Sequence, residues 1–148
     1  MTIKMTIEEI ETMLESEPLI EAIRTDLPPR VSYWIGKSII KAQGIYKGYL
    51  KERNTQQLKY AVLDEQGNVK SVEKTLNGRQ VRELVFKSDA DKSECMDAIN
   101  ELVKTEEDLG IEKIVLDWDK LEERWQEGKI TTSPMVIMPI IPLLEPPK

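Results

Sequence analysis

The sequence predicts a mainly α protein: an antiparallel helical hairpin with a short N-terminal helical unit, minor β structure and an extended, proline-rich C-terminal arm. Three observations predict this class. Apolar residues recur at spacings of three and four in two long segments, a turn-rich insertion separates these segments, and prolines interrupt the apolar run that closes the chain. We therefore expect a single mainly helical domain over residues 1–132, followed by the arm at 133–148.

The N-terminal helical unit is expected over about residues 6–25. It opens with a capping box, because Thr6 can cap the first helical amides and Glu9 can reach back to it. Pro18 then separates a second short helical piece, "LIEAIR", from the first. The prolines of "DLPPR" end the unit, since Pro28 disfavours helical geometry at the residue before it.

The helical hairpin is expected over about residues 29–109. Its first helix should cover 29–58, where apolar residues form one broad stripe. Its second, antiparallel helix should lie within 92–109, with Gly110 as its C-cap. The insertion between them contains a turn, "LDEQGNVK", and a short expected strand, "ELVF".

A third, short helix is expected over about residues 117–127, with Asp117 as its N-cap. Trp118 and Trp125 then lie on one face of this helix together with Leu121. The two tryptophans could form a stacking platform for a ligand, or they could anchor a core or an interface. We prefer the second interpretation, because aromatic side chains contribute mainly through the area that they bury.

The composition excludes several kinds of chemistry. The chain has no histidine and one cysteine, Cys95, so it cannot build a Ser-His-Asp or Cys-His catalytic site or a histidine- or cysteine-rich zinc site. It also lacks the glycine-rich loops that bind phosphates and dinucleotides. We expect no enzyme activity, no metal and no cofactor. Chemistry that uses carboxylates alone is the remaining enzymatic alternative, and nothing in the sequence clusters the acids.

The charge points to protein partners. A net charge of −6 argues against broad contact with nucleic acid or with an anionic membrane surface. The first residues lack the layout of a secretory signal, and no stretch reaches the roughly 18 apolar residues of a membrane span. We expect a protein made in the cytoplasm that contacts protein subunits, and neither nucleic acid nor membrane.

The closing segment "SPMVIMPIIPLLEPPK" is strongly apolar. Pro139 and Pro142 would interrupt an α-helix at roughly 3 kcal/mol each, and in a central strand they would remove ladder bonds, so the segment is expected to be extended. Two interpretations stay open: the segment covers its own domain, or it docks as an arm on a neighbouring subunit. In the second case the partner-binding residues are its apolar side chains: Met135, Val136, Ile137, Met138, Ile140, Ile141, Leu143 and Leu144.

Three stretches resemble a loosely defined family of small tailed-bacteriophage proteins. They are "PPRVSYWIGKSI", "YLKERNTQQLKYAVLDEQGNV" and "CMDAINELVKTEEDLGIEKIVLD", and the resemblance covers about residues 28–120. It implies a virion or morphogenesis component that works as an oligomer or inside a larger assembly, in the host cytoplasm and in the virion. No active-site residues are carried over by it, and the N-terminal unit and the proline-rich tail depart from the pattern.

These observations lead to one functional hypothesis and one alternative. The first is a non-enzymatic phage structural or assembly protein, whose C-terminal arm docks on a neighbouring subunit. The alternative is an acidic regulatory or inhibitory protein that binds a host protein.

Overall fold

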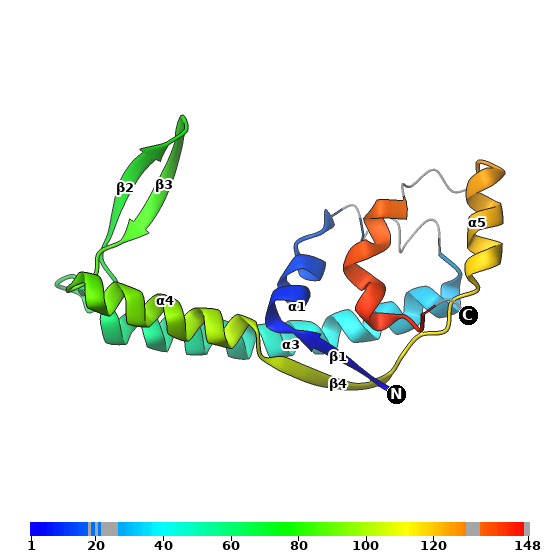
Figure 1. Cartoon of the computed structure of the whole chain (residues 1–148), viewed down its shortest axis with the longest axis horizontal. Coiled ribbons are helices and arrows are strands. Elements are labelled where there is room, and N and C mark those ends of the chain that lie inside the picture. Colours follow the sequence, from blue (N-terminus) through cyan, green and yellow to red (C-terminus); the bar gives the residue numbers. More distant parts are fainter. Residues whose placement is uncertain (18, 20, 22–26, 130–133, 147–148) are drawn as a thin grey trace. The chain divides into compact units, whose positions relative to one another are not determined.

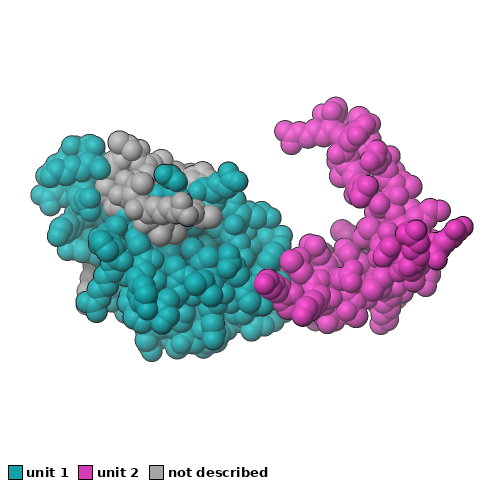
Figure 2. Space-filling view, turned by 180° about the vertical axis from the view of Figure 1, so that it is seen from behind, with its two compact units in different colours: residues 1–46, 105–148 teal, residues 47–104 magenta. Residues whose placement is uncertain are grey.

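The computed structural model describes residues 1–148 except 18, 20, 22–26, 130–133 and 147–148, and for 134–137 it describes the backbone alone. The chain divides into two compact units, unit 1 (residues 1–46 and 105–148) and unit 2 (residues 47–104) (Figure 2). The elements are, in chain order, β1 (Thr2–Thr6), α1 (Ile7–Leu14), α3 (Pro29–Tyr60), β2 (Ser71–Leu76), β3 (Arg79–Leu84), α4 (Asp89–Val103), β4 (Glu106–Glu112), α5 (Trp118–Gln126) and the 3-10 helix η1 (Pro134–Leu143) (Figure 1).

The fold is mixed α/β, so the predicted mainly α class with minor β structure is wrong. The described structure is 56 % helical and 23 % strand, and it contains two small antiparallel sheets. One sheet pairs β1 with β4, and the other pairs β2 with β3. The strands are short and rich in charged residues, so the alternation of apolar and polar residues that identifies a half-buried strand is weak in them.

In unit 1, β1 alternates buried and solvent-facing side chains. Ile3 and Met5 are fully buried, whereas Lys4 between them is exposed, as the two-residue period of a half-buried strand requires. On β4, Leu109 is fully buried. Together with Ile10 and Met13 of α1, which are also buried, these side chains belong to the apolar core of unit 1.

The strand β4 corrects the predicted second helix. α4 ends at Val103 with Lys104 as its C-cap, so residues 106–109 are strand and Gly110 is not a helix cap. Gly110 has a φ of +67° and lies where the pairing slips, because Thr2 pairs with Glu112 while Lys4 pairs with Asp108. A glycine allows this left-handed bulge without steric cost.

The helix starts follow local signals. The Thr6 hydroxyl accepts a hydrogen bond from the Glu9 amide at 3.2 Å, which confirms the predicted N-cap of α1. Asp117 likewise caps α5 through the Lys120 amide at 3.0 Å. In the second piece of the predicted N-terminal helical unit, "LIEAIR", residues 20 and 22–24 lie outside the described part of the chain.

The long helix predicted at 29–58 is confirmed by α3, which begins at Pro29. Its last part, residues 47–60, belongs to unit 2 together with α4. There the two helices run antiparallel (Figure 1). The Cys95 thiol of α4 lies 3.9 Å from the Gln56 carbonyl oxygen of α3.

The C-terminal segment is a 3-10 helix over Pro134–Leu143, so the prediction of an extended arm is wrong for these residues. A 3-10 helix has three residues per turn, which places residues i and i+3 above one another. Pro139 and Pro142 therefore share one side of η1. Ile140 and Leu143 share a second side and are buried, whereas Met138 and Ile141 share a third and are about half exposed.

η1 packs on β1 and α1, and hydrogen bonds fasten its end to unit 1. The Ile114 amide donates to the Leu143 carbonyl at 2.8 Å, and the Glu145 amide donates to the Ile114 carbonyl at 2.9 Å. The described end of the segment thus covers its own unit.

We expect Ile140→Ala to lower the free energy of unfolding by roughly 2–5 kcal/mol, because it removes a buried side chain and leaves a cavity. Ile141→Ala is the matched control: Ile140 is 1 % exposed and Ile141 is 49 % exposed. The control should cost less than about 1 kcal/mol. Urea unfolding followed by circular dichroism measures both, and equal losses would show that η1 does not dock in this way.

Candidate interaction surfaces

The predicted partner-binding residues of the C-terminal segment are divided by the structure. Ile140, Leu143 and Leu144 lie in the core of unit 1, and Met138 and Ile141 remain exposed. The side chains of residues 135–137 lie outside the described part of the chain. The described part of the segment therefore offers two exposed apolar side chains to a partner.

A second surface is the hairpin of β2 and β3, which the sequence analysis did not identify. Asn77 and Gly78 connect the strands and have φ values of +52° and +77°. Two such residues form the type I′ turn that matches the twist of paired strands. The Asn-Gly pair between alternating side chains was the signal that could have revealed the hairpin.

The hairpin has almost no cover in the structure. All six residues of β2 are exposed, as are the first four of β3, while Glu83 and Leu84 are half-buried. Figures 1 and 2 show that the hairpin extends away from the helices of unit 2. An isolated two-stranded ribbon is at best marginally stable in water.

One face of the hairpin carries apolar residues around an ion pair. Val72, Leu76 and Val81 are exposed by 42 %, 58 % and 42 %, and the alternation of side chains puts them on one face. On the same face Lys74 Nζ lies 2.7 Å from Glu83 Oε2. Lys92 of α4 approaches the other oxygen of Glu83 at 3.4 Å.

Lys74 and Lys92 lower the pKa of the Glu83 carboxyl group through hydrogen bonds and charge. Glu83 therefore stays ionised to lower pH in the folded protein. Such exposed pairs contribute little to stability, because water and salt screen them. They hold the base of the hairpin near α4 and leave the apolar face uncovered.

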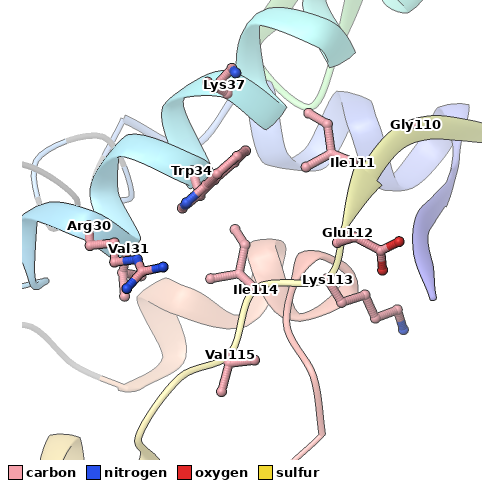
Figure 3. Close-up of a pocket in the computed structure, with 10 residues that line it drawn as sticks. All are labelled: Arg30, Val31, Trp34, Lys37, Gly110, Ile111, Glu112, Lys113, Ile114 and Val115. Atoms are coloured by element: carbon pink, nitrogen blue, oxygen red, sulfur yellow. The ribbon is translucent and has the colours of Figure 1, made fainter.

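A third surface is a cleft in unit 1 with a volume of about 620 Å³, between α3 and the residues from Gly110 to Val115. Its apolar lining includes Val31, Ile111 and Ile114. Figure 3 shows Trp34 and Ile111 reaching into the cleft from opposite walls, with the Glu112 and Lys113 side chains pointing away from α3. Clefts of this volume are typical of sites for small molecules.

The cleft is basic at its α3 wall. The Lys37 ammonium lies 5.0 Å from the centre of the Trp34 ring and 5.6 Å from that of Tyr33. None of the ion pairs among the described residues includes Lys37 or Arg30. The helix α3 carries seven Lys or Arg residues and one acidic residue, although the whole chain has a net charge of −6. The cleft thus suits a group with an apolar body and a negative charge.

The other candidate residues do not form a reactive site. Trp118 and Trp125 are half-buried, and the Trp118 indole donates to the Glu145 carbonyl at 3.4 Å. Cys95 is buried, which raises the pKa of its thiol and makes it a poor nucleophile at neutral pH. Within the described residues, no group of three Asp, Glu or Cys side chains is placed to hold a metal ion.

On β4, the Asp108 carboxylate accepts hydrogen bonds from the Gly110 amide at 2.8 Å and the Thr2 hydroxyl at 2.8 Å. These bonds lower the pKa of Asp108, with the Gly110 amide as the largest cause. Asp108 thus has a structural role at the bulge between β1 and β4.

Comparison with protein-family models, with curated proteins and with solved structures finds no match to this chain. None of the described helices combines the length and the apolar character needed to cross a bilayer.

The charge around Trp34 can be tested by fluorescence quenching in a Trp118→Phe/Trp125→Phe variant, where Trp34 is the only tryptophan. The quantity measured is the ratio of quenching by iodide to quenching by caesium. We expect this ratio to be about twofold higher for Trp34 than for free N-acetyltryptophanamide, because Lys37 and Arg30 attract the anion. Adding Lys37→Gln and Arg30→Gln should lower the ratio of iodide to caesium quenching to that of the free compound. A ratio that these two changes leave unaltered would contradict a basic cleft.

Proposed function

We propose that this protein is a non-enzymatic structural or assembly protein of a tailed bacteriophage, acting through protein–protein contacts. The observation that carries the protein-contact role is the β2–β3 hairpin, whose residues are largely exposed and whose apolar face lacks cover among the described residues. The bacteriophage part of the proposal rests on the sequence resemblance over about residues 28–120. Exposed apolar side chains grouped on one face are typical of interaction sites.

Local contacts favour the paired strands of the hairpin before a partner binds. The Asn77-Gly78 turn favours the paired strands, and the Lys74–Glu83 pair joins them across the ribbon. At its base, the Lys70 amide donates to the Val62 carbonyl and the Val85 amide donates to the Lys70 carbonyl, at 2.8 and 3.0 Å. A preformed strand pair loses less conformational entropy on binding than a disordered segment does.

The hairpin supports the proposal better than the C-terminal segment does. Three of the apolar side chains of that segment lie in the core of unit 1, where a partner could reach them only after η1 is displaced. The proposed contact surface is therefore on unit 2.

Replacing residues 71–84 by Asn-Gly tests this proposal. Lys70 and Val85 are already hydrogen-bonded to each other, so a two-residue turn can close the shortened ribbon without disturbing its base. We expect the variant to keep the helical circular-dichroism spectrum and the melting temperature within a few degrees, but to lose association in sedimentation velocity experiments. The matched control is Ser71→Thr/Thr75→Ser, which should keep association, because these two side chains lie on the face of the hairpin that does not carry Val81.

Quantitative mass spectrometry of purified phage particles gives the second measurement. An assembly protein of the virion should be present at a defined copy number, and the shortened variant should be incorporated less. Normal incorporation and unchanged association of the variant would refute the proposal. Absence from the particles, together with hairpin-dependent binding to a host protein, would favour the acidic regulatory alternative.

A further inference from the structure

The strand β3 has a free edge. Within the described residues its sheet contains β2 and β3 only, so one side of β3 has no strand partner. Pairs in an antiparallel ribbon alternate between hydrogen-bonded and non-hydrogen-bonded, and Leu76 and Arg79, next to the two-residue turn, form a hydrogen-bonded pair. The backbone groups of Gln80 and Arg82 consequently point away from β2. Such an edge is a template for another strand.

The sequence of β3 around Val81, "RQVRE", carries opposite charges at equal distances from that valine. Arg79 and Glu83 lie two residues before and after Val81, so all three side chains project from the same face. When a two-fold axis passes between two antiparallel strands at one residue, a residue that lies a given number of positions before it faces the residue that lies the same number of positions after it on the other copy. With the axis at Val81, Arg79 lies opposite Glu83 of the second copy, and the two valines lie opposite each other.

Neighbouring registers lack this complementarity. An axis at Gln80 would place Arg79 opposite Val81 and Glu83 opposite Asn77, so that no charged pair forms, and an axis at Arg82 would oppose two arginines. Like charges directly opposite one another destabilise a sheet, whereas opposite charges and apolar pairs stabilise it. The charges of β3 therefore select the register centred on Val81.

We propose that two copies of this chain associate through their β3 edges, antiparallel and centred on Val81, into a four-stranded sheet in the order β2–β3–β3–β2. This rests on the proposed function and names a second copy as the partner of the hairpin. Glu83 can take the additional arginine, because an ionised carboxylate has about four acceptor positions and Lys74 and Lys92 occupy two. The backbone groups of Gln80 and Arg82 supply the hydrogen bonds between the two β3 strands, and their side chains lie on the face of the sheet that does not carry Val81.

The contact at the axis can be captured by a disulfide. Val81 meets its counterpart in a non-hydrogen-bonded pair, where Cα atoms are about 4.5 Å apart, within the range that a disulfide spans. Val81→Cys in the full chain should therefore form a covalent dimer rapidly under mild oxidation. Val72→Cys is the matched control, because both valines are 42 % exposed on the same face but Val72 lies on the outer strand. Wild-type Cys95 is buried and should not cross-link.

A charge exchange tests the register independently. Arg79→Glu and Glu83→Arg should each weaken self-association roughly tenfold, because two opposite-charge pairs become like-charge pairs. An equimolar mixture of the two variants should recover association, since every facing pair in the mixed dimer again has opposite charges. Sedimentation equilibrium of each variant and of the mixture measures this.

Fast cross-linking of Val81→Cys, slow cross-linking of Val72→Cys and recovery in the mixture are the expected results. Equal cross-linking rates at the two positions, or no recovery in the mixture, would overturn the β3 contact. If association still depends on the hairpin in that case, the proposed function stands with another partner. If association does not depend on the hairpin, the proposed function fails as well.

Discussion

The antiparallel pairing of β1 with β4 is the interaction on which the rest of unit 1 depends. It brings the first residues of the chain against Glu106–Glu112, one hundred or more positions later. Ile3 and Met5 are thereby buried with Leu109, and Ile114, beyond the end of β4, can exchange hydrogen bonds with Leu143 and Glu145. Both ends of the chain belong to one core for this reason, and unit 2 is an insertion within it.

This arrangement gives the two units different roles. Unit 1 buries most of the large apolar side chains, including the described end of the proline-rich segment, and so resembles an ordinary folded core. Unit 2 buries few apolar residues, among them Tyr49, Ala61 and Cys95, and it presents its hairpin to solvent. A ribbon with so little cover contributes little to stability, which is consistent with retention of the hairpin for contacts outside the chain.

The charge distribution of the chain supports selective contacts. Acidic residues outnumber basic ones overall, yet α3 is strongly basic and β3 carries opposite charges at equal distances on either side of Val81. Charges placed this way favour particular registers and partners more than they add affinity. The basic wall beside Trp34 and the Arg79–Glu83 spacing on β3 are separate examples, one on each unit.

By itself, the sequence determined the features that depend on neighbours within a few positions. The Thr6 and Asp117 caps, the start of α3 at Pro29 and the exclusion of histidine chemistry all follow from residue type and short spacing. The hairpin also had a local signal, Asn77-Gly78, although the strands on either side carry few apolar residues and so give only a weak alternating pattern. Only the tertiary structure decided that Glu106–Glu112 is a strand, that Pro134–Leu143 winds as a 3-10 helix, and that Trp34 faces a cleft. The physical reason is that these three outcomes depend on packing between residues far apart in the chain, which local propensity does not encode.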